Sequence, residues 1–241
     1  MDHLVVVTGA SAGLGAALLA AAPAGAHRVD VSRSGRAPEG GSHLALDLAE
    51  PAAWPVFGQA FARLVSERDW DRITVVHNAG TLQPIGFAGE VDTDAYTRNV
   101  LLNSAAGQVL GHLVLQAVRD RDARRELLLI SSGAATNPRA GWSSYGAAKA
   151  AGDQWVRAVG EEQAERGGVR VLSVAPGVVA TAMQAHIRAT DASDFPGVER
   201  FQALHDAGEL LDPDDVARRL WDVLDDPDVP TGAVLDLRDR A

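Results

Sequence analysis

Short apolar runs alternate with longer helical patterns along most of the chain. The strand-like runs are rich in Val, Leu and Ile and cover residues 4–8, 27–32, 42–46, 72–77, 126–131, 169–175 and 231–237. Helical patterns lie between them, at residues 14–22, from about 51 to 67, at 94–118 and up to about 166. This alternation predicts a parallel, doubly wound sheet with helices on both faces.

The fifth predicted strand, residues 126–131, has four consecutive apolar residues between its two ends. Its nearly continuous Leu and Ile imply that this strand is buried on both faces. No internal repeat, linker-like tract or break in composition divides the 241 residues, 46% of which are hydrophobic. We therefore expect a single domain over residues 1–241 with one substantial core.

Composition and charge argue against several classes of function. With 32 acidic and 22 basic residues the formal charge is −10, and no basic run stands out, which argues against nucleic-acid and anionic-membrane partners. The chain has no cysteine and its seven histidines do not cluster, so we expect no metal site. The first apolar run is too short for a signal peptide and no later one reaches membrane-spanning length, so we expect a soluble, cytoplasmic protein.

Tyr145 and Lys149 carry the strongest candidate chemistry. Their i, i+4 spacing places the ammonium beneath the phenol on one face of a predicted helix. A nearby cation would lower the phenol pKa from about 10, which suits a general acid. An exposed pair on an ordinary helix has the same spacing. Lys149 is the only lysine of the chain, however, which indicates a need for its compact ammonium.

The segment TGASAGLG, residues 8–15, joins the first predicted strand to the first predicted helix. Its glycines allow a tight turn and the close approach of a pyrophosphate, while the helix N-terminus offers free N–H groups and the positive end of a dipole. A glycine-rich turn can also be no more than a tight turn. Alone, the loop leaves cofactor binding open.

Four signatures in order resemble the short-chain dehydrogenase/reductase family over essentially the whole chain. They are TGASAGLG at residues 8–15, HNAG at 77–80, the set Ser132, Tyr145 and Lys149, and Pro176-Gly177 followed by Thr181. The resemblance implies a Rossmann-type, seven-stranded parallel sheet that binds its cofactor across the carboxyl ends of the strands. His77 departs from the pattern, because the family usually has asparagine there, and this puts the usual strand contact of that asparagine in doubt.

The resemblance also implies catalytic roles. Tyr145 would give a proton to the substrate carbonyl oxygen as hydride arrives from the nicotinamide, and Ser132 would hold that oxygen. Lys149 would bind the nicotinamide ribose and tune Tyr145, while Asn103 would position a water of a proton relay.

Two neighbours compete with these residues by type. Ser132, and not Ser131, lies 13 positions before Tyr145, and Ser131 is interpreted as a packed hydroxyl at the strand end. Small residues follow Asn103, as in the family, and do not follow Asn99 in that way.

For the cofactor, the resemblance implies contacts from the ends of several strands. The positions are Gly9, Ser11, Gly13, Leu14, Gly15, Arg33, Ser34, Asp47, Leu48, Asn78, Ala79, Gly80, Tyr145, Lys149, Pro176, Gly177, Val179 and Thr181. Asp47 could instead cap the following helix.

The end of the second strand should decide which nicotinamide cofactor binds. An acidic residue there would bind a ribose 2′-hydroxyl and a basic residue a 2′-phosphate. Asp30 lies within the strand, whereas Arg33 and the hydroxyls of Ser11, Ser32 and Ser34 suit a phosphate. We expect NADP(H), with an exposed loop arginine as the alternative for Arg33.

Within the family, three stretches are similar to sepiapterin reductases and bacterial benzil reductases: ISSGAATNPRAGWSSYGAAKAAGD, VRVLSVAPGVVATAMQ and TGAVLDLRD. Residues 181–211, with Phe195 and Phe201, would then cover the substrate. The substrate residues implied are Ser132, Trp142, Tyr145, Gly177, Met183 and Asp236. Trp142 could wall the pocket or belong to the core.

Asp236 discriminates between two substrate classes. It occupies the place of the aspartate that anchors the pterin in sepiapterin reductases, where a carboxylate can accept two N–H groups; a diaryl diketone offers none. The alternative is a strand-end aspartate that caps a turn or meets Arg238 or Arg240 at the surface.

The resemblance implies an NADPH-dependent carbonyl reductase that acts on a small dicarbonyl or a pterin side-chain ketone. There are two alternatives: an enzyme that oxidises a secondary alcohol at the same site, and a non-catalytic NADP(H) sensor on the same fold. It also implies a homodimer or homotetramer through helices at residues 105–118 and 148–164, whose apolar residues could equally face the sheet.

Overall fold

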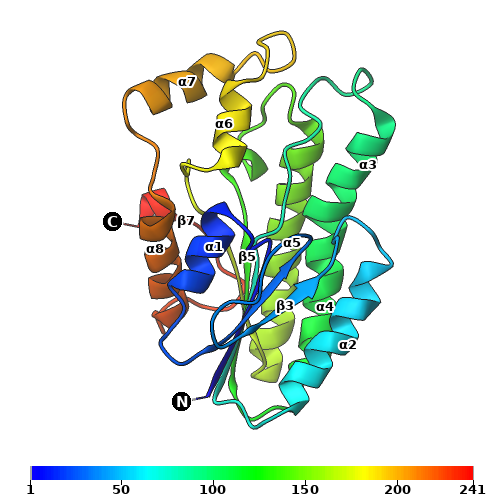
Figure 1. Cartoon of the computed structure of the whole chain (residues 1–241), viewed down its shortest axis with the longest axis vertical. Coiled ribbons are helices and arrows are strands. Elements are labelled where there is room, and N and C mark those ends of the chain that lie inside the picture. The colour runs from blue at the N-terminus through cyan, green and yellow to red at the C-terminus, as the bar shows by residue number, and fades with distance from the viewer. Residues whose placement is uncertain (1, 241) are drawn as a thin grey trace.

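The computed structural model describes residues 2–240. Seven parallel strands form one sheet in the order β3-β2-β1-β4-β5-β6-β7, in the middle of the molecule (Figure 1). The strands are β1 (His3–Thr8), β2 (His27–Ser32), β3 (Ser42–Ala45), β4 (Arg72–His77), β5 (Arg124–Ile130), β6 (Arg170–Ala175) and β7 (Val234–Asp236). The seven-stranded parallel sheet expected from the sequence is confirmed.

Helices cover both faces of this sheet. They are α1 (Gly13–Ala20), α2 (Ala53–Ser66), α3 (Thr93–Val100), α4 (Ala106–Val118), α5 (Ser143–Arg166), α6 (Ala182–Arg188), α7 (Val198–Asp206) and α8 (Pro213–Asp225). Helix α1 packs beside α8 on one face, and α2, α4 and α5 lie on the other. The short helices α6 and α7 stand above the carboxyl ends of the strands (Figure 1).

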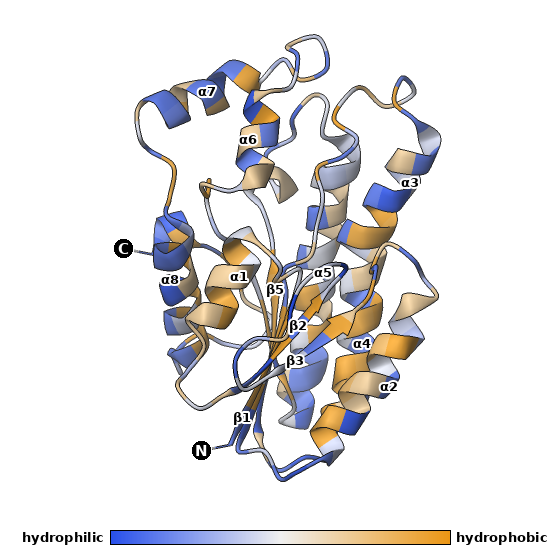
Figure 2. Ribbon diagram, viewed as in Figure 1, coloured by the Kyte–Doolittle hydropathy of each residue, from blue (hydrophilic) through white to orange (hydrophobic). Residues whose placement is uncertain are grey.

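The apolar residues of the strands form the middle of two cores, one on each face of the sheet (Figure 2). In β5, Leu128 packs toward α1 and α8, whereas Leu127 and Leu129 pack toward α2 and α4. All three are at most 5% exposed. Burial on both faces is what the unbroken apolar sequence of this strand requires.

The helix expected over residues 94–118 is interrupted. Helix α3 and helix α4 are joined by the π-helical turn η1 (Leu101–Ala105), which contains Asn103. A π turn inserts one residue into the helical repeat, and such turns often occur at functional sites. By length and composition the run Thr93–Val118 could cross a membrane, but here its buried residues pack beside α2 and the sheet.

Two further elements differ from the sequence pattern. Strand β7 has only three residues, because the chain bends around Gly232, which has a φ of +82°. Helix α8 was not predicted as a separate element. It begins at Pro213, and the Asp212 carboxylate caps it by accepting the N–H groups of Asp214 and Asp215.

Candidate active site

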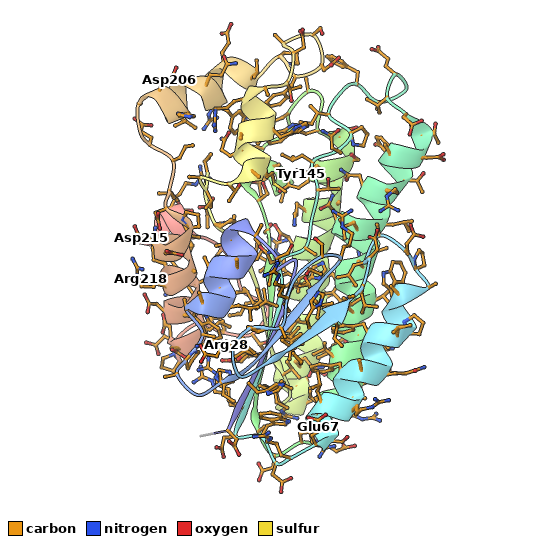
Figure 3. The ribbon with its side chains drawn as sticks, in the orientation of Figure 1. Arg28, Glu67, Tyr145, Asp206, Asp215 and Arg218 are labelled. Carbon is orange, nitrogen blue, oxygen red and sulfur yellow. The ribbon has the colours of Figure 1, made fainter. Side chains whose placement is uncertain are left out.

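A cleft of about 900 Å³ opens at the carboxyl ends of the strands. Tyr145 lies on the upper part of α5, at the end of the molecule that carries α6 and α7, while Glu67 marks the opposite end (Figure 3). Every sequence-predicted site residue lines this cleft except Gly15, Asn103 and Asp236. Because the strands are parallel, the loops that follow them converge at this edge.

The glycine loop is built for close backbone approach. Gly9 and Gly13 have φ angles of +68° and +55°, in the left-handed region that favours glycine. A Cβ on Gly15 would lie 2.3 Å from the Gly9 carbonyl oxygen, so this residue allows α1 to pack against the loop instead of lining the cleft. Ala12 supplies no side-chain cap to α1, which leaves the first N–H groups of the helix available to a phosphate.

Asn78 and Thr8 tie this loop to the end of β4. The Asn78 side-chain amide donates to the carbonyl oxygens of Thr8 and Gly9, both at 3.2 Å. The Thr8 hydroxyl accepts the backbone N–H groups of Asn78 and Ala79 at 3.1 and 3.0 Å. These bonds hold residues 78–80 against the glycine loop and give the cleft a preformed floor.

His77 takes the place of the family asparagine and is 6% exposed. Its Nδ1 lies 3.1 Å from the Thr8 hydroxyl oxygen, whose acceptor positions are filled by two backbone N–H groups. Thr8 must therefore donate to Nδ1, so His77 is neutral and carries its proton on Nε2. Burial, and then the charge of Lys149, lower the pKa of His77 to about 3. Histidine thus replaces the strand contact that the sequence left in doubt.

The catalytic candidates come from two adjoining segments. Ser132 follows β5, with its hydroxyl accepting the Ala134 N–H at 3.2 Å, and it is hydrogen-bonded to the Tyr145 phenol on the first turn of α5. One helical turn later, the Lys149 ammonium donates to the Ile130 carbonyl oxygen at 2.7 Å. Its Nζ lies 5.7 Å from the centre of the Tyr145 ring. The structure therefore brings Ser132, Tyr145 and Lys149 together, as the spacing predicts.

The expected lowering of the Tyr145 pKa is wrong. Burial raises the pKa of Tyr145, and the Ser132 hydrogen bond opposes this shift only in part. Burial also lowers the pKa of Lys149 to about 8, against the opposing charge of Asp153. Removal from water disfavours the charged form of both side chains. Tyr145 therefore keeps its proton near neutral pH.

Asn103 lies behind the cleft. Its side-chain oxygen accepts the Thr81 N–H at 3.0 Å, and its amide donates to the Thr81 carbonyl oxygen at 2.7 Å and to Asn99 Oδ1 at 2.9 Å. Asn99 in turn donates to the Thr81 and Gln83 carbonyl oxygens. The two asparagines act together, and their side chains hold residues 81–83 along the cleft.

At the end of β2, the acidic residue is buried and the basic residue is exposed along the cleft, as the sequence predicts. Asp30 is 2% exposed and accepts the Ser32 hydroxyl at 2.8 Å, so it is turned away from the cleft, while Arg33 and Ser34 are exposed along it. The Ser32 hydroxyl also accepts the Gly35 N–H, and is thereby engaged within its own turn. Of the hydroxyls expected to suit a phosphate, those of Ser11 and Ser34 stay available.

Asp47 has a structural partner that the sequence did not suggest. Its carboxylate accepts the Ala49 N–H at 3.0 Å and pairs with Arg98 of α3 at 2.9 Å. Asp47 does not cap the following helix, because α2 begins after Ala52 and has no side-chain cap; its carboxylate closes the preceding turn instead, and the residue lines the cleft.

Trp142 fills both of the roles left open for it. It is 6% exposed, stacks on Phe195 with ring centres 4.7 Å apart, and meets the Tyr145 ring edge-on at 5.8 Å. It also lines the cleft with Phe201 and the partly exposed Met183, whereas Phe195 is fully buried behind them. The segment after Thr181 therefore forms an apolar wall beside Tyr145.

Asp236 does not line the cleft. Its two carboxylate oxygens accept the Nε and Nη2 groups of Arg238 at 2.9 and 2.5 Å, and one also accepts the Arg238 backbone N–H. The surface ion pair, which was the alternative reading, is the arrangement found. The guanidinium of Arg238 reaches the cleft instead, near Gly133.

A family model described as short chain dehydrogenase matches residues 3–192, which include the glycine loop, Asn103 and the Ser132, Tyr145 and Lys149 set. The chain is a short-chain dehydrogenase. The proteins of this family are oxidoreductases that use a nicotinamide cofactor, and this short-chain dehydrogenase is an oxidoreductase of that kind.

Two of the curated proteins to which the chain is similar are named as reductases. A benzil reductase ((S)-benzoin forming) of Bacillus subtilis (strain 168) is 35% identical over 98% of this chain and 99% of its own length. A sepiapterin reductase of Meriones unguiculatus is 31% identical over 81% of this chain and 74% of its own. Among solved structures, the KRED1-Pglu enzyme is 30% identical, with a TM-score of 0.81 over 97% of this chain and all of its own.

Several cleft residues of this short-chain dehydrogenase were missed at the level of sequence. They are Thr81, Gln83, Arg98, Arg139, Gln184, Arg200 and Arg238. Arg139 lies inside the stretch already singled out around Tyr145, and its charge could have drawn attention. Gln184 and Arg238 also lie inside stretches that resemble the sepiapterin and benzil reductases. Thr81, Gln83, Arg98 and Arg200 lie outside every motif, and only the fold brings these four to the cleft.

Proposed function

We propose that this short-chain dehydrogenase is an NADPH-dependent carbonyl reductase that reduces one ketone of a small dicarbonyl compound. The observation that carries this proposal is the buried Tyr145 phenol, hydrogen-bonded to Ser132 at the cleft and set above Lys149. A cofactor sensor would not need this set, and its retention supports an enzyme over a binding module.

The residues can share the work as follows. Ser132 and Tyr145 both offer a hydroxyl to a carbonyl oxygen in the cleft, which orients the substrate and stabilises negative charge as it forms on that oxygen. Because the Tyr145 pKa is raised, the phenol is protonated and can give its proton to the oxygen. When bound, the nicotinamide supplies the hydride. The positive charge of Lys149 then stabilises the phenolate that the proton transfer leaves.

NADPH is favoured over NADH by the end of β2. Arg33 is exposed along the cleft with no carboxylate within 4 Å among residues 2–240, so its guanidinium is available to a 2′-phosphate. Asp30, the acidic residue of this strand, is committed to the Ser32 hydroxyl and lies 3.8 Å from His43. The free N–H groups at the start of α1 and the left-handed glycines of the loop suit the pyrophosphate.

A diketone is favoured over a pterin by the state of Asp236. Both oxygens of its carboxylate are occupied by Arg238, so a pterin would have to displace an existing charge-assisted pair. The cleft wall of Trp142, Phe201 and Met183 offers apolar surface to an aryl ketone. The extent of the match to the benzil reductase points the same way.

The test is cofactor oxidation by the purified protein with benzil and sepiapterin, each with NADPH and with NADH. We expect benzil turnover with NADPH, slower turnover with NADH, and little with sepiapterin. The non-catalytic sensor would be favoured if the protein binds the cofactor but neither reduces any carbonyl with NADPH nor oxidises any secondary alcohol with NADP⁺. Faster oxidation of alcohols than reduction of ketones near neutral pH would favour the dehydrogenase direction.

We also propose a homodimer through α4 and α5, which lie beside each other on one face. Light scattering after size-exclusion chromatography tests it, since a mass of 25.3 kDa, that of one chain, would contradict the dimer. The cytoplasmic location expected from the sequence stays a prediction.

A further inference from the structure

The cleft is positively charged although the chain as a whole carries a formal charge of −10. Asp47 is the only acidic residue among those that line it in the described part of the chain. Six basic residues line it: Arg33, Arg98, Arg139, Lys149, Arg200 and Arg238. Such a local excess of one sign raises the local concentration of ligands of the opposite sign.

The sheet order divides the five arginines among these side chains into two groups. Arg33 follows β2 and Arg98 belongs to α3, where Arg98 is already paired with Asp47 and Glu50. Arg139, Arg200 and Arg238 belong to the segments after β5, β6 and β7, on the other half of the sheet. The first group is on the side of the glycine loop. The second is on the side of Ser132 and Trp142, where the substrate is expected.

Arg139 is the innermost member of the second group. It lies just before α5 and is partly buried, with its guanidinium carbon 5.4 Å from the centre of the Phe201 ring and 5.9 Å from that of Trp142. Burial lowers the pKa of Arg139, and the charges of Arg200 and Arg238 lower it further. The fold therefore holds this guanidinium among aromatic rings and other cations, at a cost in electrostatic energy.

Two of these three arginines have no acidic partner. Arg238 is neutralised by Asp236, whereas Arg139 and Arg200 have no carboxylate within 4 Å among residues 2–240. The chain has ten more acidic than basic residues, so most arginines could find an acidic partner. Two arginines without such a partner at one end of the cleft therefore stand out. Arginine is also the side chain best suited to hold a planar carboxylate through two parallel hydrogen bonds.

We propose that Arg139 and Arg200 form a carboxylate-binding subsite, so that the preferred carbonyl substrate of this enzyme is an anion. The aromatic wall would take an apolar or aryl part of the same molecule, and the ketone would reach Ser132 and Tyr145. This inference rests on the proposed carbonyl reductase function and specifies its substrate class. The neutral benzil named for the relative would then be only part of what the cleft accepts.

Matched substrates test the subsite. Two acids of different reach are compared with their methyl esters, benzoylformate for a short span and 4-carboxybenzil for a longer one, with NADPH as reductant. Within each pair only the charge and one methyl group differ. We expect kcat/KM for the acid to exceed that for the ester by about tenfold or more in at least one pair. Raising NaCl from about 0.05 to 0.5 M should reduce this preference.

Variants then assign the preference to residues. In the double variant Arg139→Gln, Arg200→Gln, the acid-to-ester ratio should fall to near one. The control Arg63→Gln removes an exposed arginine of α2 that does not line the cleft, and its ratio should equal that of the wild type. The subsite would be overturned if esters are turned over as well as acids in both pairs. It would also be overturned if the preference for acids survives the double substitution.

A binding measurement separates this inference from the proposed function. Calorimetry on the NADP⁺-loaded protein gives the dissociation constants of the same acids and esters without turnover. If no carbonyl is reduced, the proposed function fails, yet an acid bound about tenfold more tightly than its ester, with loss in the double variant, still supports the subsite. If ketones are reduced but acids bind no better than esters, the subsite fails and the reductase stands.

Discussion

Replacing His77 by asparagine should change how the stability of the protein depends on pH. The Thr8 hydroxyl donates to His77 Nδ1, because its acceptor positions are filled by the Asn78 and Ala79 N–H groups. A proton added to Nδ1 would face the hydroxyl hydrogen. Burial and the Lys149 charge act in the same direction, and the pKa of His77 falls from 6.5 to about 3.

The sign and size follow from proton linkage. In the unfolded chain His77 binds a proton below about pH 6.5, whereas the folded protein keeps it neutral down to about pH 3. The stability is therefore full above pH 6.5 and is lost as the pH falls below it. Each pH unit costs about 1.4 kcal/mol, so by pH 5 the loss from this single residue is about 2 kcal/mol of unfolding free energy.

Urea unfolding at pH 7.5 and at pH 5.0 measures this effect. His77→Asn should lower the stability at pH 7.5 only moderately, since asparagine is the usual family residue there, and should lose about 2 kcal/mol less than the wild type between the two pH values. The control His205→Asn changes an exposed histidine of α7 and should keep the wild-type dependence. An equal pH dependence of wild type and His77→Asn would refute the assigned tautomer and its buried, neutral state.

Three further changes test other parts of the site. Arg33→Ala should raise the dissociation constant of NADPH about tenfold and leave that of NADH nearly unchanged, as measured by competitive titration; an unchanged NADPH value would remove the phosphate contact. Asp153→Asn removes the charge that supports the Lys149 ammonium, so the fall of kcat/KM on the alkaline side should move to lower pH, whereas an unmoved profile would mean that Lys149 does not set that limb. If Asp236 anchored a pterin, Asp236→Asn would lower kcat/KM for sepiapterin tenfold or more. Because Asp236 pairs with Arg238, we expect kcat/KM to fall less than about fivefold for sepiapterin and benzil alike, and a large loss confined to sepiapterin would restore the pterin role.

The strands and the cofactor loops could be predicted because their signals are local. Each strand is a short apolar run, and each loop residue follows its strand directly, so one sheet topology brings Gly9, Asn78 and Pro176 to the same edge. Helix α8 also had a local signal, Asp212-Pro213, which marks a capped helix start.

Other features depend on partners distant in sequence. The raised pKa of Tyr145 arises from burial beneath residues such as Trp142 and Phe195, which no i, i+4 argument includes. The π turn around Asn103 has the same apolar pattern as an unbroken helix. Glu126 directly precedes the apolar residues of β5 but is 2% exposed, and its partners Arg72 and Arg170 lie on the two neighbouring strands.

The arginine subsite is the extreme case of this dependence. Arg139, Arg200 and Arg238 are spread over 100 positions and belong to three different loops or helices. Their charges have no common pattern in the sequence, whose net charge is negative. Only the convergence of the segments after β5, β6 and β7 places them at one end of the cleft.

The central claim is that the buried Tyr145 is the proton donor of a carbonyl reductase. The most direct measurement is the rate of NADPH oxidation with benzil by the wild type and by Tyr145→Phe, with NADPH binding measured in both. Phenylalanine keeps the ring against Trp142 and removes only the hydroxyl, so cofactor affinity should change little while kcat falls by about 10²–10⁴-fold. Equal rates in the two proteins would contradict the account.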